Sequence, residues 1–178
     1  MNLPNKITIF RMCMIPFFLV FFLMDGIPYG NVISLAIFII ACLSDALDGH
    51  LARKHNLVTN FGKFMDPLAD KLLVCTALLC FVEQGTLNLI VAIVIVAREF
   101  IISGFRLVAA EGGLVLAASY WGKFKTAAQM VMCCLLIVHL DFGWFAMLET
   151  VFIWLSFALT VISLLDYLVK NKSVLKTK

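Results

Sequence analysis

The chain has 178 residues, of which 63% are hydrophobic and only 14% are charged. A soluble domain carries roughly 25% charged residues, so this composition indicates an integral membrane protein and excludes an ordinary soluble enzyme. The formal net charge of +3 leaves no extended basic surface outside the apolar segments, which argues against a nucleic-acid partner. The length fits one membrane domain, residues 1–178, without a separate soluble domain.

Six apolar stretches approach the roughly 20 residues that a membrane-spanning helix needs. They cover roughly residues 7–25, 31–52, 66–83, 87–109, 122–140 and 144–168. We therefore expect an all-α integral membrane protein with six transmembrane helices. The opening segment NLPNKITIFR mixes basic and apolar residues, a pattern that is compatible with a short amphipathic helix at the membrane surface before the first span. Because proline is best tolerated in the first turn of a helix, Pro67 predicts that the third helix begins close to Asp66.

Basic residues lie on one side of this six-helix arrangement. They occupy both termini and the second and fourth connections, whereas the three opposite loops, near residues 25–30, 83–86 and 140–143, contain no Lys or Arg. The positive-inside rule predicts a multi-pass protein of the inner (cytoplasmic) membrane, with both termini and the second connection in the cytoplasm. We interpret the acidic residues of the opposite side as solvated loop charges; they are Asp25, Glu83, Asp141 and Glu149.

Zinc and disulfide chemistry find little support in the sequence. The six cysteines lie in apolar runs without C-x-x-C spacing, so we interpret them as buried free thiols. The three histidines are not at ligand spacing to one another.

Four aspartates stand out in the stretch SDALDGHLARKHNLVTNFGKFMDPLADK, residues 44–71. Asp45 and Asp48 are three residues apart, and Asp66 and Asp70 are four apart, so each pair shares one face of a helix. The short segment between the pairs is of the kind that turns two helices antiparallel, so the pairs can face each other near the cytoplasmic surface. Four carboxylates in a low dielectric repel one another unless cations lie between them. Oxygen ligands suit Mg²⁺ or Mn²⁺, and two such ions would balance the four charges.

Small and basic residues accompany the aspartates. Gly49 and Gly62 let a backbone or a ligand approach closely, and Arg53 is placed to hold a phosphate. A single D-x-x-D at a helix end is usually a solvated rim, but two pairs on neighbouring helices with adjacent glycines favour a site.

This stretch resembles the CDP-alcohol phosphotransferase family, whose pattern is D-x-x-D-G-x-x-A-R, eight residues, then G-x-x-x-D-x-x-x-D. The chain reads DALDGHLAR, KHNLVTNF and GKFMDPLAD, so every fixed position matches. Family members cleave a CDP-linked lipid or alcohol, transfer the phosphate-bearing group to a second alcohol and release CMP. The resemblance implies that the four aspartates bind two metal ions, that Asp70 is also the general base, and that the protein is a homodimer. It further implies contacts to the CDP group from Gly49, Arg53, Thr59 and Gly62. Asn5, Thr8 and Arg11 would close the nucleotide side, although a position at the membrane boundary would equally explain Arg11.

Two further stretches, AREFIISGFRL and GKFKTAAQM, are similar to those of bacterial family members whose acceptor is glycerol 3-phosphate. This similarity implies transfer of the phosphatidyl group from CDP-diacylglycerol to glycerol 3-phosphate, giving phosphatidylglycerophosphate and CMP. The acceptor's phosphate needs cationic partners, and these stretches supply Arg98, Arg106, Lys123 and Lys125. A pairing with Glu99 would also explain Arg98, and a cytoplasmic boundary would equally explain the two lysines.

Other functions stay open at this point. The same chemistry with phosphatidylglycerol or inositol phosphate as acceptor would keep the aspartate site. A cation transporter would also use four aspartates, but it needs neither Arg53 nor the glycines at fixed spacing. A membrane prenyltransferase would place its two aspartate clusters on more distant segments of a longer chain.

Overall fold

The computed structural model describes residues 3–24, 26–54, 60–111 and 119–171. Side chains are described for all of these except residues 3–6, 45–54, 60–67, 70, 110 and 111. The described residues form six helices and no strand: α1 (Leu3–Leu23), α2 (Gly30–Lys54), α3 (Asn60–Glu83), α4 (Leu89–Glu111), α5 (Tyr120–Val138) and α6 (Gly143–Lys170). The prediction of an all-α protein is confirmed. The chain divides into two compact units, Met1–Glu83 and Gln84–Lys178, each with three helices.

Two predicted helix boundaries differ from the structure. The helix α1 runs unbroken from Leu3, so the amphipathic opening segment belongs to α1 and is no separate surface helix. The prediction that the third helix begins close to Asp66 is wrong, because α3 begins at Asn60 and contains Pro67 in its interior. Proline removes one backbone hydrogen bond, which the rest of a long helix can tolerate, as α1 also does at Pro16.

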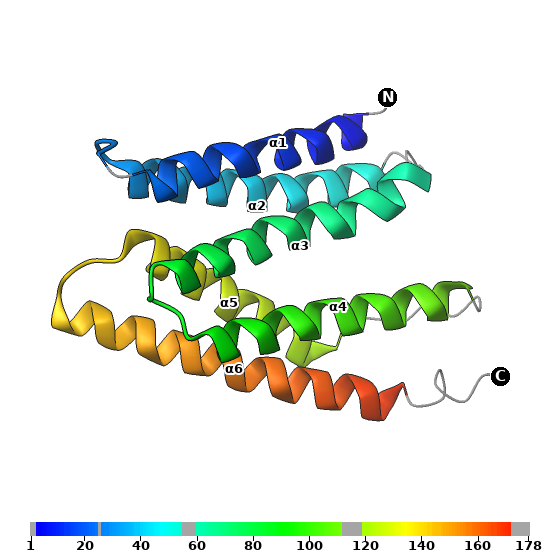
Figure 1. The fold of residues 1–178 in the computed structure, drawn as a ribbon. Coiled ribbons are helices and arrows are strands. Elements are labelled where there is room, and N and C mark those ends of the chain that lie inside the picture. The colour runs from blue at the N-terminus through cyan, green and yellow to red at the C-terminus, as the bar shows by residue number, and fades with distance from the viewer. Residues whose placement is uncertain (1–2, 25, 55–59, 112–118, 172–178) are drawn as a thin grey trace. The chain divides into compact units, whose positions relative to one another are not determined.

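In the first unit, α1 packs against both α2 and α3, and α2 packs against α3. The buried residues of α1 recur every three or four positions and so form one face; they are Thr8, Arg11, Ile15, Phe18 and Phe22. Aromatic rings join the three helices, since Phe18 lies 6.3 Å from Phe38 of α2 and Phe22 lies 5.7 Å from Phe81 of α3, centroid to centroid. The start of α1, the end of α2 and the start of α3 lie at the same end of this unit (Figure 1).

In the second unit, α6 packs against α4 and α5 with a mainly polar face. Its buried residues are Phe145, Glu149, Ser156, Thr160, Ser163 and Tyr167. Its exposed residues are large and apolar, among them Trp144, Met147, Trp154, Leu165 and Val169. A helix in water shows the opposite arrangement, so α6 is suited to a lipid environment.

Within the described part of the chain, α5 and α6 are long and apolar enough to cross a membrane. The six spanning helices of the sequence-based prediction are therefore supported in part, and six spans stay a prediction.

Two interpretations of single residues are wrong. Glu149 is no solvated loop charge, because it lies in α6, is 7% exposed and has its Oε1 atom 3.0 Å from Nδ1 of His139. Cys13 is exposed on α1, whereas Cys80 and Cys133 are buried free thiols as expected. Sequence alone does not reveal which side of an apolar helix faces its neighbours.

Candidate active site

The four aspartates lie on the helical hairpin of the first unit. Asp45 and Asp48 lie near the end of α2, and Asp66 and Asp70 lie in the first half of α3, which runs in the opposite direction (Figure 1). Asp48 and Asp66 are equally far in sequence from residue 57, the middle of the connection. Because every helical residue adds the same rise, equal distances along two antiparallel helices would bring those positions to about the same level.

The helical register relates these positions to the core of the first unit. On α2 the buried row is Ser34, Phe38 and Ala41, and the same three- and four-residue steps lead to positions 45 and 48. On α3 the buried row is Leu73, Ala77 and Phe81, and the same steps lead back to positions 70 and 66. All four backbone positions therefore continue the rows that face the other helices. The aspartate side chains lie outside the described ones.

Residues expected on the nucleotide side also belong to this end of the unit. Thr8 is 0% exposed and Arg11 is 1% exposed, on the same face of α1. Burial of Arg11 shows that a position at the membrane boundary is not a sufficient explanation for this residue. The backbone positions of Asn5 on α1, Gly49 and Arg53 on α2, and Gly62 on α3 are helical, but their side chains lie outside the described ones. Thr59 lies outside the described residues altogether.

A metal site is not visible among the described side chains, which contain no group of three or more His, Cys, Asp or Glu placed to hold an ion. The four aspartates are outside that set, so the predicted metal site stays a prediction.

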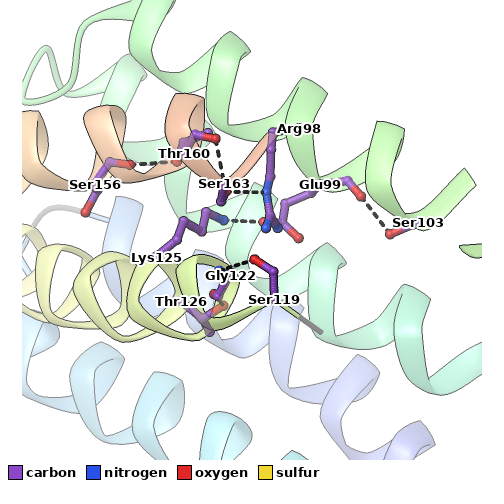
Figure 2. Close-up of polar contacts among 10 residues, drawn as sticks. All are labelled: Arg98, Glu99, Ser103, Ser119, Gly122, Lys125, Thr126, Ser156, Thr160 and Ser163. Atoms are coloured by element: carbon purple, nitrogen blue, oxygen red, sulfur yellow. Dashed lines mark hydrogen bonds and ion pairs between the residues drawn. The ribbon is translucent and has the colours of Figure 1, made fainter. Parts of the chain in front are cut away.

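A second cluster of charged residues lies in the second unit (Figure 2). Arg98 of α4 donates through Nε to Oγ of Ser163 on α6, at 3.1 Å, and through Nη1 to Oε1 of Glu99, at 3.1 Å. Lys125 of α5 forms an ion pair with the same Oε1 atom of Glu99. Arg98 is 8% exposed and Lys125 is 1% exposed, so two cations from different helices meet at one carboxylate in a buried place.

Hydroxyl groups support this cluster from α6. Oγ of Ser163 donates to the carbonyl of Thr160 at 3.0 Å, and Oγ1 of Thr160 donates to the carbonyl of Ser156 at 2.6 Å (Figure 2). Ser163 is therefore held by its own helix while it accepts the hydrogen bond from Arg98.

The first turn of α5 lies beside the guanidinium group. Ser119 caps α5 by accepting a hydrogen bond from the backbone N–H of Gly122, at 3.2 Å. A Cβ atom at Gly122 would lie 3.3 Å from Nη2 of Arg98, so the arginine would have to shift slightly to admit it. Glycine at this position therefore leaves room for the arginine.

The four basic residues expected to bind the acceptor fall into two classes. Arg98 and Lys125 are buried together, whereas Arg106 and Lys123 are exposed. Nζ of Lys123 lies 5.6 Å from the centre of the Tyr120 ring, a cation–π contact at the surface. From the sequence, Glu99 was expected only as a partner of Arg98. Ser163 was not expected at this site, because it is 65 residues from Arg98 and the contact joins two helices.

Comparison with known proteins decides between the candidate families. Residues 1–162 match the CDP-alcohol phosphatidyltransferase family. The chain belongs to this family. The resemblance inferred from the aspartate pattern is therefore confirmed, and the prenyltransferase and transporter families are not supported.

Relatives of this CDP-alcohol phosphatidyltransferase are similar over nearly their whole length. A Bacillus subtilis protein named CDP-diacylglycerol–glycerol-3-phosphate 3-phosphatidyltransferase is 42% identical, and the match covers 99% of this chain and 98% of that protein. Proteins of the same name from Haemophilus influenzae and Pseudomonas fluorescens are 40% and 38% identical, and each match covers 94% of this chain. The matches cover 91% and 89% of those two proteins.

The donor set of this CDP-alcohol phosphatidyltransferase fits divalent cations. The four aspartates, two on α2 and two on α3, offer only oxygen ligands, which Mg²⁺ and Mn²⁺ prefer. Four carboxylates brought close together would repel one another without cations between them.

Proposed function

We propose that this enzyme transfers the phosphatidyl group of CDP-diacylglycerol to glycerol 3-phosphate, giving phosphatidylglycerophosphate and CMP. The main support for this proposal is the similarity, over nearly the full chain, to proteins named for this reaction, at 38–42% identity. Burial of Arg98 and Lys125 supports a phosphorylated acceptor, because among the described residues the two buried cations share a single carboxylate, that of Glu99, and a second anion would balance the remaining charge.

The chemistry is a displacement at phosphorus. The acceptor's hydroxyl oxygen forms a bond to the phosphorus that carries diacylglycerol, and the bond from this phosphorus to the CMP oxygen breaks. We assign Asp70 as the base that takes the hydroxyl proton, a role that a carboxylate within hydrogen-bond reach can fill. Arg98 and Lys125 would hold the phosphate of the acceptor by charge-assisted hydrogen bonds and so orient its hydroxyl.

The aspartate hairpin would hold two divalent cations, Mg²⁺ or Mn²⁺, through Asp45, Asp48, Asp66 and Asp70. Such ions, when bound, neutralise the pyrophosphate and the leaving CMP. The level register of Asp48 and Asp66 and the inward rows of α2 and α3 support this assignment.

The CDP group would lie at the same end of the first unit. The proposed contacts come from Gly49, Arg53, Thr59 and Gly62, with Asn5 and Thr8 on the nucleotide side. Thr8 and Arg11 are buried polar residues near the start of α1, which supports a polar environment at this end of the unit.

We also propose that the protein is a single domain with six membrane-spanning helices and that it is a homodimer in the inner membrane. The polar inner face of α6 and the one-sided distribution of Lys and Arg support spanning helices with both termini and the active site in the cytoplasm. A fluorescent reporter fused after Lys178 should fold and fluoresce, whereas a periplasmic phosphatase reporter there should be inactive. The reverse result would contradict the proposed orientation.

The reaction is tested by CMP release from the purified protein in detergent. The assay contains CDP-diacylglycerol, Mg²⁺ or Mn²⁺, and in turn glycerol 3-phosphate, phosphatidylglycerol, inositol phosphate or serine. We expect release only with glycerol 3-phosphate, its loss on chelation with EDTA, and its return when either metal is restored.

Each other outcome has a definite meaning. Release with a different acceptor would refute glycerol 3-phosphate and keep the transferase chemistry. Release that survives complete chelation would refute the metal site. No release with any acceptor, from protein that elutes as one symmetric species, would refute the transferase and favour cation transport.

A further inference from the structure

Glu99 is the charged residue of the Arg98–Lys125 cluster to which the proposed function gives no role. Its Oε1 atom accepts a hydrogen bond from Nη1 of Arg98 and pairs with Nζ of Lys125 (Figure 2). The two cations come from α4 and α5, so this one oxygen is the point where they meet. Two cations side by side in a buried place repel each other, and a carboxylate between them offsets that repulsion.

The pairing leaves hydrogen-bond donors for a ligand. An arginine has five N–H donors and a lysine has three. Arg98 uses Nε for Ser163 and Nη1 for Glu99, while Nη2 makes no hydrogen bond to any described residue. Lys125 donates to Glu99 alone among the described residues. A phosphate can therefore bind the remaining donors of both cations while Glu99 keeps its own contacts.

We propose that Glu99 is a positioning residue for the acceptor substrate. Its carboxylate holds the Arg98 guanidinium and the Lys125 ammonium close enough for both to bind the phosphate of glycerol 3-phosphate. Ser163 fixes the guanidinium from the opposite side, through Nε. The inference rests on the proposed function, because it deepens the acceptor site of that reaction. Glu99 takes no part in bond making or breaking.

Two other roles for Glu99 make different predictions. A purely structural ion pair would affect both substrates and the stability together when it is removed. A carboxylate that competes with the acceptor for the two cations would, when neutralised, lower the apparent KM for glycerol 3-phosphate. A positioning residue raises that KM and leaves the lipid substrate unaffected.

The test compares wild type with Glu99→Gln, which keeps the size of the side chain and removes its charge. We expect about a tenfold rise in the apparent KM for glycerol 3-phosphate, because a charge-assisted contact is lost. Inorganic phosphate, used as a competitive inhibitor, should show a similar rise in its inhibition constant. The apparent KM for CDP-diacylglycerol should change less than about twofold. Glu83→Gln, at the exposed end of α3, is the matched control and should leave all three constants unchanged.

Two more variants keep the test decisive if Glu99→Gln yields no folded protein. Glu99→Asp retains the charge on a shorter side chain, and Ser163→Ala removes the contact to Nε of Arg98. Each should raise the KM for glycerol 3-phosphate about threefold, with no effect on the lipid. An unchanged or lowered KM for glycerol 3-phosphate, or equal changes for both substrates, would overturn the positioning role. Wild-type protein that releases no CMP with glycerol 3-phosphate would instead refute the proposed function itself.

Discussion

Replacement of Arg98 by alanine tests the acceptor site most directly. The variant loses two contacts, from Nε to Ser163 and from Nη1 to Glu99, each of 3.1 Å. Neither partner is left alone, since Ser163 still donates to the Thr160 carbonyl and Glu99 still pairs with Lys125. We therefore expect the variant to fold, with a moderate loss of stability.

The expected loss of activity is larger than the loss of stability. Truncating one partner of a buried, hydrogen-bonded charge pair costs about 2 kcal/mol or more. If Arg98 binds the acceptor's phosphate, kcat/KM for glycerol 3-phosphate should fall at least about 30-fold. The apparent KM for CDP-diacylglycerol, at saturating glycerol 3-phosphate, should change less than about threefold. Arg98→Lys should be intermediate, because lysine keeps the charge but lacks the planar fork and the Nε donor.

The assay is the initial rate of CMP release, with each substrate varied while the other is saturating. Elution as a single species in detergent is the control for folding. Equal losses for both substrates would show that Arg98 supports the structure of the unit and does not select the acceptor. A loss confined to the lipid substrate would refute the reasoning entirely.

Three further substitutions, with one matched control, test the base, the first turn of α5 and the core of the first unit. Asp70→Asn should lower kcat for CMP release by about 100-fold or more at unchanged elution in detergent, and a loss below tenfold would remove Asp70 as the base. Gly122→Ala should raise the KM for glycerol 3-phosphate severalfold, because its Cβ would lie 3.3 Å from Nη2 of Arg98; an unchanged KM would mean that the guanidinium is not held there. Phe18→Ala, at a position with 0% exposure, should lower the free energy of unfolding by about 3–5 kcal/mol and lower the midpoint of thermal unfolding. Phe17→Ala, 61% exposed on the same helix, should have little effect, and equal effects would contradict the assignment of the α1 core face.

The helices could be predicted from sequence because apolar runs of spanning length are bounded by charged or glycine-containing segments. The start of α3 could not, since Asn60–Phe64 is not an apolar run and Pro67 suggested a boundary. The rule for proline describes the cost of one lost hydrogen bond, and α3 is long enough to accept that cost. The prediction that Glu149 is a solvated loop charge was wrong for a different reason, because the sequence does not show that His139 lies within contact of its carboxylate.

For the aspartates, the spacing within one helix carries the information, and the structure confirms that their four backbone positions are helical. Two aspartate pairs at three- and four-residue spacing define helix faces without knowledge of the fold. The residues expected to bind the acceptor could not be separated in this way. Lys123 and Lys125 have the same charge and lie two positions apart, so they point to different sides of α5, and only the packing shows that Lys125 is the buried one. The contact between Arg98 and Ser163 joins two helices and has no signal in the sequence.

The polar face of α6 connects the expected membrane setting of the enzyme with the proposed binding of its acceptor. In lipid, apolar side chains can face outward at no cost, so the inner face of a helix is free to carry small hydroxyl residues. On α6 these are Ser156, Thr160 and Ser163, all 0% exposed. Small side chains let neighbouring helices approach, and the hydroxyl of Ser163 then reaches Nε of Arg98. A soluble helix with this pattern would expose its apolar side to water, so the arrangement that fixes the guanidinium depends on the same lipid that supplies the other substrate.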